Sequence, residues 1–292
     1  MSIGARVEAT GPAADLAESL PAEPPLLSVG IVVYGSDLDL LERTLDSLEA
    51  ALGALPRAGG TACPVFVVDN GPPEYSSRLA ARLAARGPWP VVLSGHGNVG
   101  YGRGNNLAID RSRARYHLVL NPDVELAPDA LANGLAHLER HPEVGLVAAS
   151  AFGPGGQALR LCKRRPSVAV LALRAMPRRH VPRAALPLLE RYDVAPSPDG
   201  CTDVTGQLVS GSFMLCRRAL LQAVGGFDPG YFLYFEDFDL SLRIGAHARL
   251  HWLADVRLLH HGGQAARKGW THRRMFAASA LRFFSTHGWR LA

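Results

Sequence analysis

The sequence has few cysteines and no long apolar run. Cys63, Cys162, Cys201 and Cys216 are its four cysteines, and no two of them have the close spacing of a zinc-binding pair. This number does not suggest a disulfide-held scaffold, and we expect four free thiols in a reducing compartment. No stretch approaches the roughly 20 apolar residues that a membrane-spanning helix needs. The sequence therefore favours a cytoplasmic protein.

The charge balance is mildly basic. The formal net charge is +5 at pH 7, and 48% of the 292 residues are hydrophobic, as in a soluble globular protein. Such a balance suits an anionic partner, for example a nucleotide, a phosphate group or a membrane surface. It is too weak to indicate nucleic acid, so no nucleic-acid partner is expected. Residues 1–25 lack the apolar core of a signal peptide and are rich in Ala, Pro, Glu and Gly, which predicts a disordered leader.

Short apolar runs alternate with segments of helical periodicity over the first half of the chain. The predicted strands cover 28–33, 65–68, 91–93, 117–120 and 145–149. Helices are predicted after Asp37, over 75–86 and 104–113, and after Pro128. This alternation predicts an α/β protein with a Rossmann-like, mainly parallel open sheet and helices on both faces.

Polar residues follow four of these strands. Tyr34 follows the first, Asp69 and Asn70 the second, a Gly/Asn loop at 95–106 the third, and Asn-Pro-Asp at 121–123 the fourth. Open parallel sheets bind ligands at the carboxyl ends of their strands, so these groups are expected along one binding edge. The alternative for any one of them is that turns simply favour such residues.

The second half is less regular. Residues 153–204 contain several prolines and little periodicity, which predicts a long insertion or connecting region. A strand over 209–216, a short helix from Arg217, strand material over 249–263 and a helix over 268–292 are predicted beyond it.

The stretch Tyr-Phe-Leu-Tyr-Phe-Glu-Asp-Phe-Asp-Leu-Ser-Leu-Arg at 231–243 places three carboxylates, Glu236, Asp237 and Asp239, among five aromatic rings. An ionised carboxylate is costly to bury unless it is paired, hydrogen-bonded or bound to a metal. The structural alternative is that Glu236 and Asp237 cap a helix that begins near 238. Asp239 is spaced to pair with Arg243 on such a helix.

Two further motifs are weak when taken alone. The glycine-rich segment 97–109 lacks the Gly-Lys-Ser/Thr ending of a phosphate-binding P-loop, but its glycines allow close approach to a ligand. Asp123 comes just after a predicted strand, where one carboxylate and the phosphates of a substrate can hold Mg²⁺ or Mn²⁺. Asp123 could equally be a turn residue.

Taken together, these motifs resemble the family 2 glycosyltransferases, inverting enzymes with the GT-A fold that use nucleotide-diphospho-sugars. The resemblance covers about 27–284 and rests on SVGIVVYGSD, VVDN, NVGYGRGNNLAI, LNPDV, VSGSFMLC with GGFDPGYFLYFEDFDLSLR, and LLHHGG, in this order. NVGYGRGNNLAI, LNPDV and GGFDPGYFLYFEDFDLSLR are most similar to the bacterial rhamnosyltransferase branch. It implies one GT-A domain over 26–292, with a nucleotide-binding half at 26–150 and an acceptor-binding, catalytic half at 151–292.

The resemblance also implies roles by position. Asp237 matches the catalytic base, with Glu236 orienting the base or the acceptor. Asp123 matches the metal-binding acid for Mg²⁺ or Mn²⁺, with Asn121 in place of the first acid of that element. His260 matches a histidine that faces the metal or the diphosphate, although His261 beside it leaves the position open by one, and a purely structural histidine is the alternative.

The donor side is implied in the same way. Asp69 matches the acid that holds the nucleobase, with Tyr34 beside it. Asn98, Gly100 and Asn106 match the loop that approaches the nucleotide and its diphosphate.

The implied function is transfer of a sugar, foremost rhamnose from dTDP-rhamnose, to a saccharide or lipid-linked saccharide in cell-surface polysaccharide synthesis. Two alternatives stay open: the same fold with another donor, such as a UDP-hexosamine or UDP-galactofuranose, and a non-catalytic module that binds sugar or membrane. Residues 271–290 mix arginine and histidine with aromatic side chains. They could lie peripherally on the inner face of the plasma membrane, although packing of 275–284 on the protein is favoured.

Overall fold

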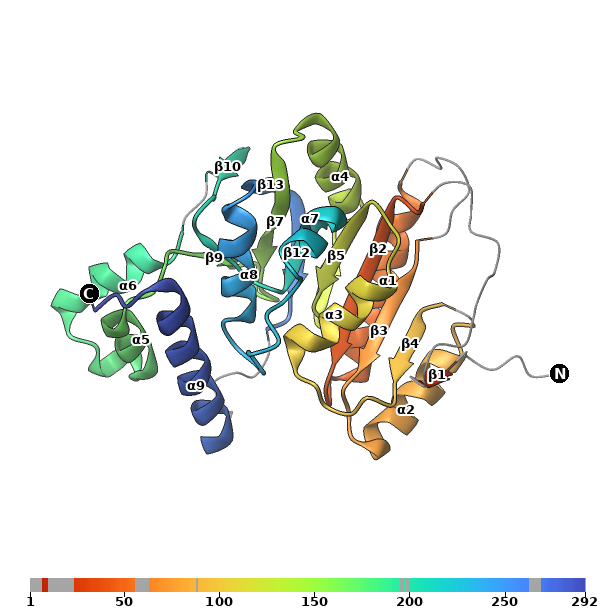
Figure 1. Cartoon of the computed structure of the whole chain (residues 1–292), viewed down its shortest axis with the longest axis horizontal. Helices are drawn as coiled ribbons and strands as arrows, with labels where there is room; N and C mark the ends of the chain where they lie inside the picture. Colours follow the sequence, from red (N-terminus) through yellow and green to blue (C-terminus); the bar gives the residue numbers. More distant parts are fainter. Residues whose placement is uncertain are drawn as a thin grey trace.

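The computed structural model describes residues 7–9, 24–55, 63–87, 89–194, 197, 200–262 and 269–291 (Figure 1). One mixed sheet of eleven strands forms the centre of the described part, and helices pack on both of its faces. The alternation of strands and helices in the sequence predicted this architecture. A two-stranded sheet, β9 with β11, stands beside it.

The order of the main sheet is β1-β4-β3-β2-β5-β12-β7-β13-β10, with β6 paired to β13 and β8 to β7. Strands β1 to β5 run parallel to one another, and β12 is inserted antiparallel between β5 and β7. The sheet therefore continues without a break across the two predicted halves of the domain. The strands of the first half are β1 Val7–Ala9, β2 Leu27–Val33, β3 Val65–Asp69, β4 Val91–Ser94, β5 Tyr116–Leu120 and β6 Val124–Leu126. Those of the second half are β7 Val144–Phe152, β8 Ala158–Leu159, β9 Cys162–Lys163, β10 Cys201–Asp203, β11 Leu208–Val209, β12 Phe213–Arg217 and β13 Arg249–His260.

Among the described residues the α-helices are α1 Leu38–Gly53, α2 Pro73–Ala84, α3 Tyr101–Arg111, α4 Ala130–Arg140, α5 Val168–Ala175, α6 Leu186–Tyr192, α7 Arg218–Ala223, α8 Glu236–Gly245 and α9 Trp270–His287. Short 3₁₀ turns cover Arg178–His180 and Arg183–Ala185. Within these segments no helix combines the length and the apolar character needed to cross a membrane.

Helices α1, α2 and α4 cover one face of the sheet. Helix α1 begins after Asp37, whose carboxylate accepts hydrogen bonds from the backbone N–H groups of Asp39 and Leu40. Its apolar residues recur at helical spacing and are buried against β2 and its neighbours. Every residue of β2 is buried, as expected for a strand covered on both sides.

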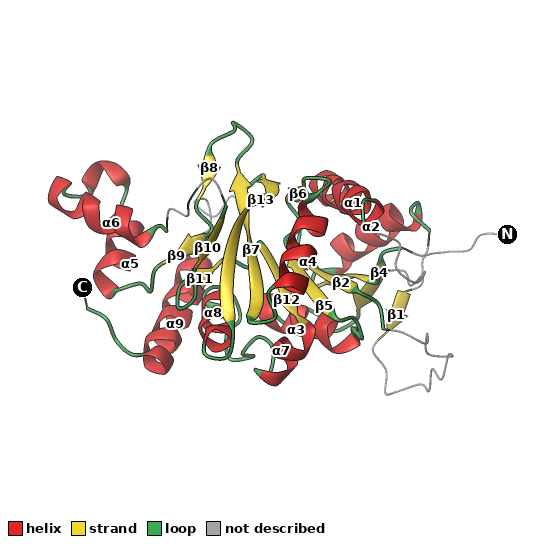
Figure 2. Cartoon of the chain, turned by 90° about the horizontal axis from the view of Figure 1, so that it is seen from above, coloured by secondary structure: helices red, strands yellow, loops and turns green. Residues whose placement is uncertain are grey.

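Helices α3, α7 and α8 cover the opposite face. Ile109 of α3, Leu221 of α7, and Leu240 and Ile244 of α8 share one apolar cluster with β12, β7 and β13. A separate cluster joins Phe283 and its neighbours on α9 to the start of α8. Figure 2 shows α5, α6 and α9 together at one end of the molecule, beyond α8.

Four expectations differ from the structure. The segment 153–204 has two helices and short strands of its own where a connecting region was predicted. The single strand expected over 209–216 is two strands, β11 and β12, separated by a turn at 210–212. In the leader, Val7–Ala9 is a strand parallel to β4, whereas the rest of 1–23 lies outside the described residues. Helix α3 starts at Tyr101, three residues earlier than predicted.

Candidate active site

The carboxyl ends of β4, β3, β2 and β5 lie side by side, because these strands are parallel neighbours. The polar residues that follow them therefore collect along one edge of the sheet, as predicted. Asp69 is the last residue of β3 and is buried, whereas Tyr34, just after β2, is 62% exposed. Of the residues predicted to bind the donor, Asp69 is thus buried and Tyr34 is exposed to solvent.

Asp69 stands in a partly buried polar corner. Its Oδ1 accepts a hydrogen bond of 2.8 Å from the backbone N–H of Gly71. Next to it, the side chain of Asn70 donates to the carbonyl of Gly100 and its Oδ1 lies 3.0 Å from Nε2 of His96. Burial lowers the pKa of His96, while the charge of Asp69 acts in the opposite direction. His96 is a residue of this corner that the sequence motifs did not single out.

The loop after β4 is held against the aromatic segment that precedes α8. Asn98 Oδ1 accepts from the backbone N–H of Gly100, at 3.1 Å. Gly100 has φ +87°, and a Cβ there would lie 2.3 Å from the carbonyl oxygen of Phe232. That same carbonyl accepts a hydrogen bond from the N–H of Tyr101. Glycine is required at 100 by both the backbone conformation and this close approach.

The side-chain amide of Asn106 is bonded to the backbone of Phe227. Its side-chain nitrogen donates to the carbonyl of Phe227, and its oxygen accepts from the N–H of Phe227, both at 2.8 Å. The amide is therefore engaged in fixing the turn before the aromatic segment. This geometry differs from the predicted contact with the nucleotide.

Asp123 and His260 meet at the next position along the edge. Asp123 Oδ1 lies 3.4 Å from Nε2 of His260, and it is buried without a hydrogen-bond partner in the described structure. His261 instead places its ring 2.5 Å from Glu125, which also pairs with Arg43. The imidazole beside the Asp123 carboxylate is thus that of His260, whereas His261 reaches Asp123 only through a backbone hydrogen bond from its N–H to the Asp123 carbonyl.

An orphaned carboxylate oxygen next to an imidazole nitrogen is an arrangement that a divalent cation would complete. A buried acceptor without a partner costs about 1–3 kcal/mol. Carboxylate oxygens are ligands that Mg²⁺ and Mn²⁺ prefer, and both ions readily take their remaining ligands from water and substrate phosphates. Asp123 and His260 therefore fit a divalent metal.

Glu236 and Asp237 form the first turn of α8. The two residues before it, Tyr234 and Phe235, have φ of 74° and 66°, a left-handed conformation that costs roughly 1–2 kcal/mol per non-glycine residue. Such strain is typical of functional segments held by their surroundings. The left-handed conformation of these two residues reverses the chain just before α8, so that Glu236 and Asp237 occupy the start of the helix.

Asp237 accepts two backbone hydrogen bonds, from Gly211 N–H at 2.8 Å and from Phe238 N–H at 2.9 Å. Burial raises the pKa of Asp237 above its ordinary range, and these bonds oppose that rise. Burial, followed by the charge of Asp237, raises the pKa of Glu236 as well. One oxygen of Glu236 is buried without a partner. Two adjacent acids with raised pKa values suit proton transfer near neutral pH.

Tyr101 connects the acids to the loop that contains Asp123, and no sequence motif singled it out for this role. Its hydroxyl lies 2.7 Å from the carbonyl of Gly211 and 3.0 Å from Oδ1 of Asn121. Burial raises the pKa of Tyr101, with further increases from the charges of Asp237, Glu236 and Asp123. Asp237, the turn at 210–212 and the loop that contains Asp123 are thus joined through one phenol.

Asp239 has a structural role, as its spacing from Arg243 predicted. It is buried and pairs with Arg243 at 2.7 Å, and its other oxygen lies 2.8 Å from Nε2 of His287 at the end of α9. Asp239 therefore ties α8 to α9 and is removed from the proton chemistry of its two neighbours.

A cavity of about 220 Å³ lies beside the two acids. It is lined by Glu236, Asp237, Lys163, Leu171, Arg174, Tyr192, Tyr234, Phe235, Phe238 and Phe276. The rings offer surfaces on which a sugar can stack, whereas Lys163 and Arg174 both pair with Asp193.

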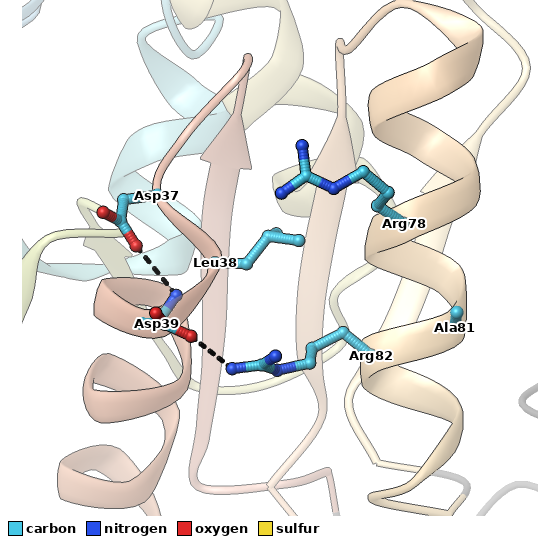
Figure 3. A pocket seen from close by; sticks show the side chains of 6 residues that line it. All are labelled: Asp37, Leu38, Asp39, Arg78, Ala81 and Arg82. Atoms are coloured by element: carbon cyan, nitrogen blue, oxygen red, sulfur yellow. Dashed lines mark hydrogen bonds and ion pairs between the residues drawn. The ribbon is translucent and has the colours of Figure 1, made fainter.

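A second cavity, of about 680 Å³, lies between the start of α1 and α2 (Figure 3). Arg82 of α2 points across it and pairs with Asp39, and it also lies 2.5 Å from Glu42. None of the predicted site residues lines it.

Comparison with known proteins decides the family. The model of the family described as "Glycosyl transferase family 2" matches residues 28–188, more than half of the chain. The chain belongs to glycosyl transferase family 2. It is a glycosyltransferase, and its α/β sheet is the GT-A fold.

Two curated relatives of this family 2 glycosyltransferase are rhamnosyltransferases. The N-acetylglucosaminyl-diphospho-decaprenol L-rhamnosyltransferase of Mycobacterium tuberculosis (strain H37Rv) is 28% identical over 229 residues, which are 73% of this chain and 71% of the relative. Rhamnosyltransferase WbbL of Escherichia coli (strain K12) is 29% identical over 176 residues, 56% of this chain and 62% of the relative.

Solved structures of the same fold are more distant in sequence. A mannosyltransferase, PcManGT from Pyrobaculum calidifontis in complex with GDP-Man and Mn²⁺, superposes with a TM-score of 0.57 at 19% identity. The match covers 91% of this glycosyltransferase but 65% of that chain. S. aureus TarS 1-349 superposes with a TM-score of 0.53 at 16% identity, over 90% of this chain and 72% of its own. These likenesses concern the fold.

Proposed function

We propose that this glycosyltransferase moves rhamnose from dTDP-rhamnose to a lipid-linked saccharide in cell-surface polysaccharide synthesis. The observation that carries the proposal is the pair Glu236-Asp237 at the mouth of an aromatic cavity, on the same edge as a buried donor-side acid. The two rhamnosyltransferase relatives support the choice of sugar and acceptor.

In the proposed reaction Asp237 takes the proton of the acceptor hydroxyl. The acceptor oxygen attacks the anomeric carbon as the bond to the nucleoside diphosphate breaks, with inversion at that carbon. Gly211 N–H and Phe238 N–H hold the Asp237 carboxylate in place, and burial favours proton uptake. Glu236 orients the base or the acceptor.

Asp123 and His260 would hold Mg²⁺ or Mn²⁺, since the orphaned oxygen and the facing imidazole fit such an ion. A bound divalent cation would offset the negative charge that grows on the leaving diphosphate. We further propose that Asn98 and the Gly100 loop lie against the nucleotide diphosphate, with Tyr34 beside the base.

Asp69 is proposed to select the donor base. A carboxylate accepts the ring N–H of thymine or uracil but not the acceptor nitrogen at the equivalent edge of adenine or cytosine. The aromatic cavity would receive the acceptor sugar.

Peripheral membrane contact through α9 would bring the enzyme to a lipid-linked acceptor on the cytoplasmic side. Trp270, Phe276 and Leu281 are 73%, 38% and 56% exposed on this helix, and Arg273 and Arg274 are exposed beside them. Aromatic and basic side chains together favour an anionic bilayer surface. Sedimentation with vesicles that contain anionic phospholipid should require these side chains, and vesicles of neutral phospholipid should bind less.

A donor screen tests the proposed function. Thymidine and uridine diphosphates should compete with the donor far better than adenosine or cytidine diphosphate, because a buried acceptor left unpaired is penalised. Asp69→Ala should flatten this ranking without abolishing turnover. Calorimetric titration of the four diphosphates against both proteins measures it, and equal affinities in the wild type would overturn the assignment of Asp69.

A further inference from the structure

Three side chains that are far apart in sequence meet away from the candidate active site. His137 lies on α4, Cys201 begins β10, and His251 lies near the start of β13. Their ligand atoms all lie within 4.8 Å of one another. Strand β13 carries His260 at its other end, and the positions opposite His251 and Leu259 on β7, Val147 and Phe152, are five strand residues apart, or about 17 Å at 3.3 Å per residue. This cluster is therefore remote from Asp123.

Two of the distances between the donor atoms are short. His137 Nε2 lies 2.9 Å from His251 Nδ1, and Cys201 Sγ lies 3.3 Å from the same nitrogen. Strand β10 pairs antiparallel with β13, which fixes Cys201 opposite Leu253 and Asp203 opposite His251. Helix α4 packs on β13 and supplies the third side chain. The three donors thus come from separate elements (Figure 1).

The surroundings suit a metal better than a proton. Burial lowers the pKa of His137 to about 4, and the imidazoles of His141 and His251 lower it further. Burial also lowers the pKa of His251. The imidazoles are then neutral at physiological pH, which is the form that binds metals. The alternative arrangement is a cluster held together only by hydrogen bonds between the rings and the thiol.

The donor set defines the class of ion. Two imidazole nitrogens and a thiolate are typical ligands of Zn²⁺ and similar borderline-soft ions, whereas Mg²⁺ and Mn²⁺ prefer oxygen. A cavity of about 570 Å³ opens beside His137 and Cys201 and gives a water molecule access to the fourth position. His141 stands one helical turn from His137, with ring centroids 4.3 Å apart, and borders the same cavity.

We propose that His137, Cys201 and His251 bind one Zn²⁺-class ion that fastens the edge strand β10 to α4 and β13. Binding replaces the thiol proton by the metal and releases that proton to solvent. The hydrogen bond between the two imidazoles breaks, and whichever of His137 Nε2 and His251 Nδ1 carries the shared proton gives it to solvent, while the other nitrogen of the same ring takes a proton up. Strand β10 is only three residues long and mostly exposed, so it gains most from such a link.

Cobalt(II) titration of chelator-treated full-length protein tests the proposal. Excess Mg²⁺ is included so that an oxygen-rich site is already filled. We expect one Co²⁺ per chain, with near-ultraviolet thiolate-to-cobalt absorption and visible bands of a four-coordinate ion, and Zn²⁺ should displace it. Hydrogen exchange of the amides of Cys201–Asp203 should slow when Zn²⁺ is added to the wild type.

Variants give the decisive comparison. Cys201→Ser should lose the thiolate band, and His251→Gln should lose more affinity than the roughly 10–100-fold that removal of an outer-sphere partner costs. Cys63→Ser and His247→Gln, a thiol and an exposed histidine elsewhere, should bind like the wild type. Absence of the cobalt bands in the wild type, or their persistence in Cys201→Ser, would overturn the proposal. The first of these results would leave only the hydrogen-bonded cluster.

Discussion

Replacing Asp237 by asparagine tests the proposed base with little change in shape. The wild-type carboxylate accepts from Gly211 N–H and Phe238 N–H. Asparagine has one acceptor oxygen, so one of these N–H groups would face an amide nitrogen. The lost bond costs about 1–3 kcal/mol of the free energy of unfolding. Burial makes the charged form of Asp237 unfavourable and raises its pKa in the wild type. Replacing this buried charge by a neutral amide therefore offsets part of that cost.

The effect on turnover is much larger than the effect on stability. General base catalysis contributes typically 10²–10⁴-fold, which at 1.36 kcal/mol per tenfold corresponds to about 2.7–5.5 kcal/mol in the barrier. Donor binding should be almost unchanged, because the donor-side residues Asp69 and Asp123 are untouched. We therefore expect Asp237→Asn to lose roughly 100-fold or more in kcat.

Single-turnover transfer at saturating donor and acceptor is the assay, with donor affinity measured separately by calorimetry. Asp110→Asn makes the same chemical change at an exposed site on α3 and serves as the control. A turnover of Asp237→Asn within a few-fold of the wild type would refute the assignment. It would then point to Glu236, whose pKa falls once the charge of Asp237 is removed.

Three further predictions follow from the site. Asp123→Ala should weaken donor binding in the presence of Mn²⁺ and leave metal-free binding unchanged, and activity of the wild type that a chelator does not reduce would contradict it. The raised pKa of Glu236 means that the folded wild type holds a proton that the unfolded chain releases, so the wild type loses stability as pH rises from about 5 to about 8. Glu236→Gln lacks this titration, and its stability relative to the wild type should therefore increase over the same range. Denaturant unfolding at both pH values measures the difference. Gly100→Ala should destabilise the loop against Phe232 and raise KM for the donor, whereas unchanged kinetics and thermal stability would show that the contact is dispensable.

Much of the fold could be predicted because local hydrophobic periodicity indicates where the strands and helices lie. Alternating apolar runs and leucine spacings gave the strands and helices of the first half, and strand ends gave the binding edge. The segment 153–204 was misjudged because its helices are short: Val168–Ala175 and Leu186–Tyr192 are too brief for periodicity to show. The break at 210–212 was missed because an apolar run can continue through a turn.

The site divides in the same way. Asp237 and Asp123 stand in motifs, whereas Tyr101 acts through Gly211, which is 110 residues away, and no local pattern signals that contact. The motif assigns Asn106 a ligand role, because no local pattern indicates its contact with Phe227, which is 121 residues away in sequence. Cys201 has no cysteine near it in sequence, and its histidine neighbours come from other elements.

The stereochemistry of the transferred sugar tests the central claim most directly. Direct displacement with Asp237 as base requires that the new glycosidic bond have the anomeric configuration opposite to that of the donor. Incubation of the wild type with dTDP-rhamnose and a lipid-linked saccharide, followed by nuclear magnetic resonance of the product, reads this configuration. We predict a rhamnosylated product with inversion; retention of configuration, or no transfer from this donor while another nucleotide-sugar is used, would contradict the account.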